Sequence, residues 1–250
     1  MGSQKIVLLV VGSFLATGIL AACGGGAEEE NASENASGRD ITDAELTMMV
    51  VSLAELGERY VGFEGNEISA FKTNDESAEE DFDPEGEAQD LERFGRVKEY
   101  VRVFGSPKNQ EPLGSEGAIL LASGVQLFEE AEGAAGYLKD YLAEMEDGTG
   151  TNSQGFTVGR GQSFKVQGIG DEAAGMRAVM AFPQDGGPGA EAYGTWVFFR
   201  RGHLLSSLLL VTTEDTDVSA TVESLSREAD NRIQAILLLA PEGTPAGTPE

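Results

Sequence analysis

Residues 193–212 read YGTWVFFRRGHLLSSLLLVT, in which two mostly apolar runs are separated by Arg201 and Gly202. Runs of this length that are rich in aromatic, β-branched and aliphatic residues are typical of strands. We therefore predict strands over 193–200 and 203–212, with Arg201 and Gly202 as a two-residue turn. Strands joined by such a short turn are antiparallel, so this hairpin predicts an antiparallel sheet.

On both sides of the hairpin, the chain alternates between strand and helix character. Val97, Val101 and Val103 follow the period of a half-buried strand, and Thr42 with Glu45 has the spacing of a capping box. We expect further strands over 96–104, 118–128, 164–167 and 174–182, and helices over 43–56, 129–147 and 218–239. The run 48–51 is also compatible with a buried strand. The expected fold is α+β, an antiparallel sheet of about five to six strands with helices packed on one face.

The first 22 residues have the three parts of a secretory signal, namely a cation at Lys5, an apolar run over 6–19 and a stretch of small residues. The string Leu20-Ala21-Ala22-Cys23 resembles the bacterial lipobox, and it contains the only cysteine of the chain. This resemblance implies cleavage before Cys23 and a diacylglyceryl thioether on its sulfur. We expect residues 1–22 to be a signal peptide and the mature chain to be extracytoplasmic, lipid-anchored to the bacterial cell membrane through Cys23.

Two other interpretations of this segment fit less well. A transmembrane helix needs about 20 apolar residues. The run 6–22 has 17 residues and includes polar or small ones, and acidic residues follow it at 28–30. An ordinary secretory cleavage site before Cys23 would need a small residue at the third position upstream, where the bulky Leu20 stands.

The chain is strongly acidic, with 43 acidic and 17 basic side chains and a net charge of −26. Loss of the signal would remove one cation and leave about −27. Such a charge repels nucleic acid, and it is compatible with cations or basic partners without selecting any of them.

Two segments lack the apolar side chains needed for a core. Residues 24–40 read GGGAEEENASENASGRD, and residues 241–250 read PEGTPAGTPE. Segments of this composition bury too little apolar surface to offset chain entropy. We therefore expect a lipidated cysteine and disordered acidic spacer over 23–40, a single α+β domain over 41–240, and a disordered tail over 241–250.

The chain resembles uncharacterised extracytoplasmic bacterial lipoproteins of the α+β class, which share this order of elements. Two short strings carry the resemblance, the turn Gly170-Asp171-Glu172-Ala173 and the hairpin Phe199-Arg200-Arg201-Gly202. These lipoproteins have no assigned activity, so the resemblance implies a compartment and a fold and leaves the function open.

The densest acidic segment, 75–92, is the best candidate for a metal site. Asp81, Asp83, Glu85, Gly86 and Glu92 approach the calcium-loop pattern D-x-[DN]-x-[DN]-G-x5-E, but Glu85 stands where Asp or Asn is expected. Asp83 followed by Pro84 is also the signature of a capped helix start, which Gly95 would end. The same backbone cannot form both structures, and the helix is the favoured interpretation, so we assign no metal ligand.

Other candidates for catalysis or cofactor binding are weak. His203, the only histidine, follows a turn and is expected at the surface. Ser69 and Lys72 match the S-x-x-K pattern of penicillin-recognising enzymes without its companion motifs. Residues 168–173 have the glycine spacing of a dinucleotide-binding loop, but a strand and not a helix follows, so a glycine turn is expected.

Adjacent aromatics on the hairpin fit a core and not a ligand cage. Alternation along a strand places Trp196 and Phe198 on one face and Phe199 on the other. No catalytic or cofactor-binding residue is assigned, and lipidation of Cys23 is the one modification predicted. The favoured hypothesis is a non-catalytic binding or interaction module of the cell envelope, held to the membrane through lipid, whose ligand is an envelope protein or a small molecule. The alternatives are an envelope enzyme using Asp or Glu carboxylates, and a calcium-stabilised domain.

Overall fold

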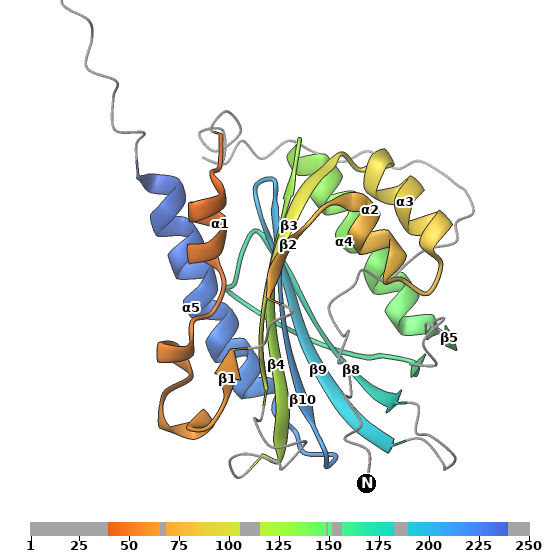
Figure 1. Ribbon diagram of the computed structural model, residues 1–250, viewed down its shortest axis with the longest axis vertical. Coiled ribbons are helices and arrows are strands. Elements are labelled where there is room, and N and C mark those ends of the chain that lie inside the picture. The colour runs from red at the N-terminus through yellow and green to blue at the C-terminus, as the bar shows by residue number, and fades with distance from the viewer. Residues whose placement is uncertain are drawn as a thin grey trace, which may run out of the picture.

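The computed structural model describes residues 40–65, 69–105, 116–148, 150–151, 157–182 and 190–239. The signal segment, Cys23, residues 24–39 and the tail from 240 onward lie outside the described residues. Ten strands of the described part form one antiparallel sheet, and helices pack on both of its faces (Figure 1). None of the described helices is long and apolar enough to cross a membrane.

The strands are ordered β1-β3-β4-β10-β9-β8-β6-β5 across the sheet, with β2 also paired to β3 and β7 to β8. Their bounds are β1 Glu64–Gly65, β2 Ala70–Lys72, β3 Arg96–Gly105, β4 Ala118–Phe128, β5 Gly150–Thr151, β6 Thr157–Val158, β7 Gln162–Phe164, β8 Glu172–Phe182, β9 Ala190–Arg201 and β10 Leu204–Thr212. Five long strands make the centre. Short strands pair with the outer sides of β3 and β8, and they cover backbone groups that would otherwise form open sheet edges.

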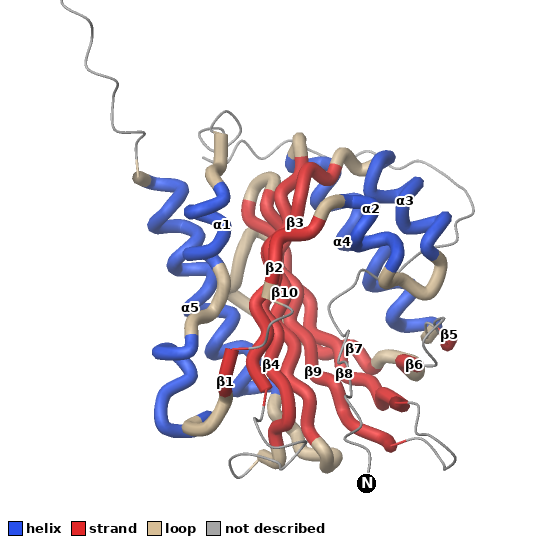
Figure 2. The backbone as a smooth tube through the Cα atoms, in the orientation of Figure 1, coloured by secondary structure: helices blue, strands red, loops and turns tan. Residues whose placement is uncertain are grey.

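The helices form two groups on opposite faces of the sheet (Figure 2). Their bounds are α1 Asp43–Met49, the 3-10 helix η1 Leu53–Tyr60, α2 Asn74–Glu79, α3 Pro84–Arg93, α4 Ala131–Asp147 and α5 Ser219–Leu238. Helices α1, η1 and α5 pack on one face, and α2, α3 and α4 lie on the other. Each face has its own apolar core.

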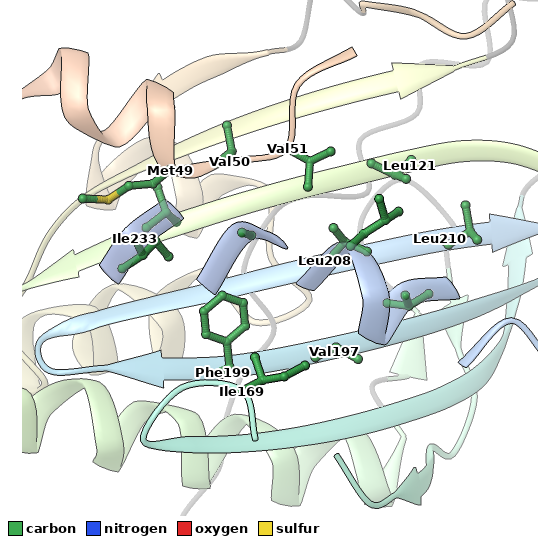
Figure 3. Close-up of a cluster of buried hydrophobic side chains, with 14 of the residues drawn as sticks. Met49, Val50, Val51, Leu121, Ile169, Val197, Phe199, Leu208, Leu210 and Ile233 are labelled. Carbon is green, nitrogen blue, oxygen red and sulfur yellow. The ribbon is translucent and has the colours of Figure 1, made fainter. Parts of the chain in front are cut away.

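Strand β10 shows why both faces are covered. Leu208 and Leu210 belong to the core under α5, while Leu205 and Leu209 belong to the core under α4. Figure 3 shows Leu208, Phe199 and Ile233 among the side chains of the first of these cores. A strand that is buried on both faces is apolar at nearly every position, as the run LLSSLLLV is.

The α+β class and the antiparallel sheet are therefore confirmed, with two corrections. Helices cover both faces of the sheet and not one. Successive residues of the central strands point to opposite faces, and apolar side chains are buried on both. The sheet has ten strands where about five to six were expected. The four additional strands, β1, β2, β5 and β6, have only two or three residues each, which is too short to carry a recognisable alternation.

The hairpin is confirmed with its turn moved by one residue. Arg201 pairs with Leu204, so Gly202 and His203 form the turn. Gly202 has a φ of +56°, and a two-residue hairpin requires a positive φ at its first turn position. Glycine meets that requirement without strain, whereas Arg201 would not.

The first helix begins as predicted and ends early. Thr42 and Glu45 form the capping box, with the Glu45 N–H donating to Thr42 Oγ1 at 3.3 Å. The helix ends at Met49, and Val50 is extended, with a φ of −87° and a ψ of 156°. The Val51 N–H then donates to Ser123 Oγ of β4 at 3.2 Å. Burial of both valines against the sheet overrides the helical pattern after Met49.

Of the other expected elements, most agree with the structure to within two residues. The exception is the strand expected over 164–167, which is found at Gln162–Phe164. Its register is set by pairing with β8, where Phe164 lies opposite Gly175. A Cβ on Gly175 would come within 2.2 Å of the Phe164 ring, so this pairing depends on glycine there.

Candidate functional site

Acidic side chains and two tyrosines gather between α3, α4 and the sheet. We call this group the carboxylate cluster, and its members are Asp81, Glu87, Asp90, Tyr137, Tyr141 and Glu144. Positions 137, 141 and 144 share one face of α4, because residues four and three apart lie above one another on a helix. The link before α3 supplies Asp81, and α3 itself supplies Glu87 and Asp90.

The cluster is closely packed and incompletely hydrogen-bonded. The Tyr137 hydroxyl donates to Glu87 Oε1 at 3.2 Å, and the rings of Tyr137 and Tyr141 stack at 6.2 Å. The Tyr141 ring also meets the edge of Phe198 on β9 at 4.8 Å. Within the described residues, Asp81 Oδ2 and Glu144 Oε2 are buried without a hydrogen-bond partner.

Burial dominates the electrostatics of the cluster. It raises the pKa of Asp81 to about 7, against the opposing effect of backbone N–H groups that donate to its carboxylate. Burial also raises the pKa of Glu144 to about 8, and the nearby charges of Asp90 and Asp81 raise it further. The pKa of Tyr141 is well above its ordinary value for the same reason. Near neutral pH the cluster therefore retains protons that free carboxylates would release.

Cations near the cluster are paired with Asp90 at its edge or with carboxylates outside it. Arg93 pairs with Asp90 at 2.8 Å and with Asp140 at 2.9 Å. Arg96 donates to Glu99 at 3.1 Å, and Lys72 pairs with Glu80. Among the described residues, no cation forms an ion pair with Asp81 or Glu144. A negative charge on either carboxylate would therefore not be neutralised by a neighbouring side chain. Chemically, the arrangement can accept and release protons near neutral pH.

The acidic segment forms the capped helix and not a calcium loop. Helix α3 begins at Pro84, and Asp83 Oδ1 accepts from the Gly86 N–H at 3.2 Å. Gly95, with a φ of +68°, follows the end of the helix as predicted. No group of three acidic, histidine or cysteine side chains is placed to hold a metal ion in the part of the chain that the structure describes.

The weaker candidates for catalysis are occupied by structural contacts. Ser69 Oγ accepts from the Val103 N–H at 3.0 Å, while Lys72 pairs with Glu80. The expected surface position of His203 is wrong, because this side chain is only 8% exposed. Its carbonyl accepts from the Phe128 N–H at 3.0 Å, which holds the turn against the end of β4. Burial lowers the pKa of His203.

The three hairpin aromatics take the predicted faces. Trp196 and Phe198 lie in the core under α4, and Phe199 lies in the core under α5. Phe198 therefore meets the cluster ring Tyr141 from the sheet side. Of the three aromatic residues, Phe198 is the one in contact with the carboxylate cluster.

The two strings that carry the lipoprotein resemblance meet in space. The Gly202 N–H donates to Asp171 Oδ2 at 2.7 Å, and Arg200 lies 3.4 Å from the same carboxylate. Asp230 of α5, 2% exposed, accepts from Arg201 at 2.8 and 3.0 Å. We call Asp171, Arg200, Arg201, Gly202 and Asp230 the arginine–aspartate network.

The segment 168–173 is the expected glycine turn, and it docks on this network. The Gly170 N–H donates to Asp230 Oδ2 at 3.0 Å. A Cβ at Gly170, which has a φ of +62°, would lie 2.4 Å from the Arg200 carbonyl oxygen. Glycine at position 170 therefore allows the turn to approach the hairpin closely. Strand β8 begins within the segment, at Glu172.

Comparison with known proteins assigns the chain to no family. No protein-family model matches the chain, and no curated protein matches it. Among solved structures, the extracellular domain of PknH from Mycobacterium tuberculosis is similar with a TM-score of 0.48 and 9% sequence identity. The similarity covers 78% of this chain and 98% of that chain.

Proposed function

We propose that this chain is a lipid-anchored, extracytoplasmic module of the bacterial cell envelope that works by binding and not by catalysis. The anchor rests on the lipobox around Cys23. The non-catalytic role rests on one structural observation, which is that two carboxylates of the cluster, Asp81 and Glu87, are covered by packing, whereas Glu144 is partly exposed. Asp81 and Glu87 are 1% and 0% exposed. A general acid or base must come within about 3 Å of the proton it transfers, and these groups do not reach the surface.

The position of the first described residues supports the tethered arrangement. Ile41 is buried in the core under α5, and Thr42 caps α1 directly after it. The chain therefore passes from the predicted spacer into the core within a few residues. A lipid anchor at Cys23 would therefore be connected directly to the packed core of the domain.

Lipidation is tested by replacing Cys23 with alanine. In the native host, the unsubstituted protein is expected to float with membranes and to have an intact mass that exceeds the mature polypeptide by the attached acyl groups. The Cys23→Ala protein should lose both properties, because two or more acyl chains supply the stable membrane binding. An unmodified Cys23 thiol in protein from the native host would contradict the proposed anchor.

A second candidate function is an envelope enzyme that uses carboxyl groups as acid and base. It is favoured by the raised pKa values of Asp81, about 7, and Glu144, about 8, since perturbed groups of this kind concentrate at functional sites. It also requires that a substrate reach both groups.

Chemical labelling of carboxyl groups separates the two candidates. A water-soluble carbodiimide with an amine nucleophile, applied to the folded protein, is expected to modify Glu85 and Glu92, which are exposed on α3. Asp81 and Glu87 should remain unlabelled until the protein is denatured, because they are covered by packing. Peptide mass spectrometry gives the readout. Rapid labelling of Asp81 in the folded state would favour the enzyme.

A further inference from the structure

Two large apolar side chains are exposed next to each other at the end of α5, on its last residue Leu238 and its C-cap Leu239. Leu238 is 84% exposed and Leu239 is 63% exposed, whereas Ile233 and Ile236 earlier in the helix are buried. A single exposed leucine needs no explanation, but adjacent ones at a helix end make an apolar tip. We call Leu238 and Leu239 the leucine tip.

The leucine tip lies at the end of the domain where the chain from Cys23 arrives. Ile41 and Ile236 belong to the same core, and Figure 1 shows the start of α1 beside the end of α5. The link from Cys23 to Asp40 has a fixed covalent limit of about 60 Å when fully extended. The lipid surface that holds Cys23 is therefore within reach of this end of the domain.

Charge favours an apolar contact over an ionic one. The mature chain is strongly acidic, so its surface repels anionic headgroups. At the start of α1, two acidic side chains already have partners within the domain. Asp43 pairs with Lys98, and Glu45 accepts from Thr42 in the capping box. A contact at this end with lipid would thus depend on the leucines.

We propose that the membrane anchoring Cys23 covers the leucine tip, so that the end of the domain formed by α1 and the C-terminus of α5 faces the lipid. This inference rests on the proposed lipid anchor. Two leucines alone bind a bilayer weakly, but the tether keeps them at a high effective concentration beside it. The acyl chains supply the anchor, and the leucines fix which way the domain points.

The chain offers a direct test because Cys23 is its only cysteine. With Cys23 lipidated, a cysteine introduced by Leu238→Cys or Val61→Cys is the single site for a spin label. Val61 is a matched control that is 73% exposed and lies between η1 and β1 in the chain, and Figure 1 shows β1 away from the C-terminal end of α5. The full lipidated protein is reconstituted into phosphatidylcholine vesicles. Accessibility to oxygen, which partitions into lipid, is compared with accessibility to a water-soluble nickel complex.

Relative to the Cys23→Ala protein in solution carrying the same label, the oxygen-to-nickel ratio at position 238 is expected to rise severalfold. At position 61 the ratio should stay unchanged. Equal water accessibility at both positions in vesicles would overturn the inference. Flotation of the vesicles reads out the anchor separately, so protein that fails to float contradicts the proposed function, and protein that floats with a water-exposed label contradicts only the orientation.

Hydrogen exchange provides a second measurement without a label. Amides in the last turn of α5 are expected to exchange more slowly in the vesicle-bound lipidated protein than in the Cys23→Ala protein in solution. Amides of η1 serve as the internal reference and should exchange alike in both. Identical exchange at the end of α5 would overturn the proposed contact.

Discussion

Replacing Asp230 with alanine is expected to destabilise the domain by about 2 kcal/mol, because it removes a buried acceptor from the Gly170 N–H and leaves Arg201 with only its 3.4 Å contact to Asp171. Asp230 is 2% exposed and accepts from Arg201 at 2.8 and 3.0 Å. It also accepts from the Gly170 N–H at 3.0 Å and from Gln234 at 3.1 Å. One carboxylate therefore joins α5 to both the hairpin and the glycine turn, and its loss affects all three.

The matched control is Asp215→Ala, which breaks an ion pair of similar length in an exposed setting. Asp215 lies 2.9 Å from Arg177, and its side chain is 69% exposed. Exposed pairs contribute less than about 1 kcal/mol, so this variant should unfold nearly as the unsubstituted protein does. Urea denaturation followed by circular dichroism measures both changes. Similar unfolding free energies for the two variants would show that the arginine–aspartate network does not join these elements.

Alkaline pH is expected to destabilise the domain through the carboxylate cluster. The pKa of Asp81 is raised from 3.8 to about 7, and that of Glu144 is raised from 4.5 to about 8. Between these values the folded state binds more protons than the unfolded state, so its stability falls as the pH rises from about 4 to about 8. Asp81→Asn, which removes the charge and retains the acceptor for the Asp83 N–H, should stabilise the domain at pH 9 by on the order of 2 kcal/mol.

At pH 3 the same variant should be close to neutral, because Asp81 is then largely protonated in both the folded and the unfolded state. Glu85→Gln is the control, since Glu85 is exposed on the same helix and should change stability little at either pH. At pH values below those at which the cluster titrates, stability depends instead on carboxylates whose pKa is lowered by folding. Burial raises the pKa of Glu55, but its hydrogen bonds to Ser52 and Arg232 outweigh that effect, so the net pKa is lowered. The stabilising contribution of Glu55 is therefore lost as the pH falls through this lowered pKa. A variant that is destabilised at pH 9 would contradict the assignment of a buried, charge-excluding site.

Local patterns in the sequence were enough for several features of the structure. The capping box of Thr42 and Glu45, the helix start at Asp83 and Pro84, and the glycine turn before β8 each depend on residues within a few positions of one another. The same holds for the hairpin, because its two apolar runs are joined directly. Such features are readable because the interacting groups are covalently close.

Other features were decided by contacts between distant parts of the chain. The carboxylate cluster joins the start of α3 to the far end of α4, and its raised pKa values come from burial that no local pattern records. The end of α1 at Met49 and the burial of His203 follow from packing against β4. Acidic composition indicated that carboxylates were plentiful, but it could not indicate which of them would be buried together.

By itself, the sequence determined the class of the fold, the antiparallel hairpin at its centre and the predicted lipid attachment at Cys23, because each rests on residues that are neighbours along the chain. Only the tertiary structure decided that helices cover both faces of the sheet, that Asp81 and Glu144 belong to one cluster, and that the end of α5 lies beside the start of α1. These depend on which surfaces meet after folding. Burial and desolvation act through space, so they are set by the packed structure and not by the order of residues.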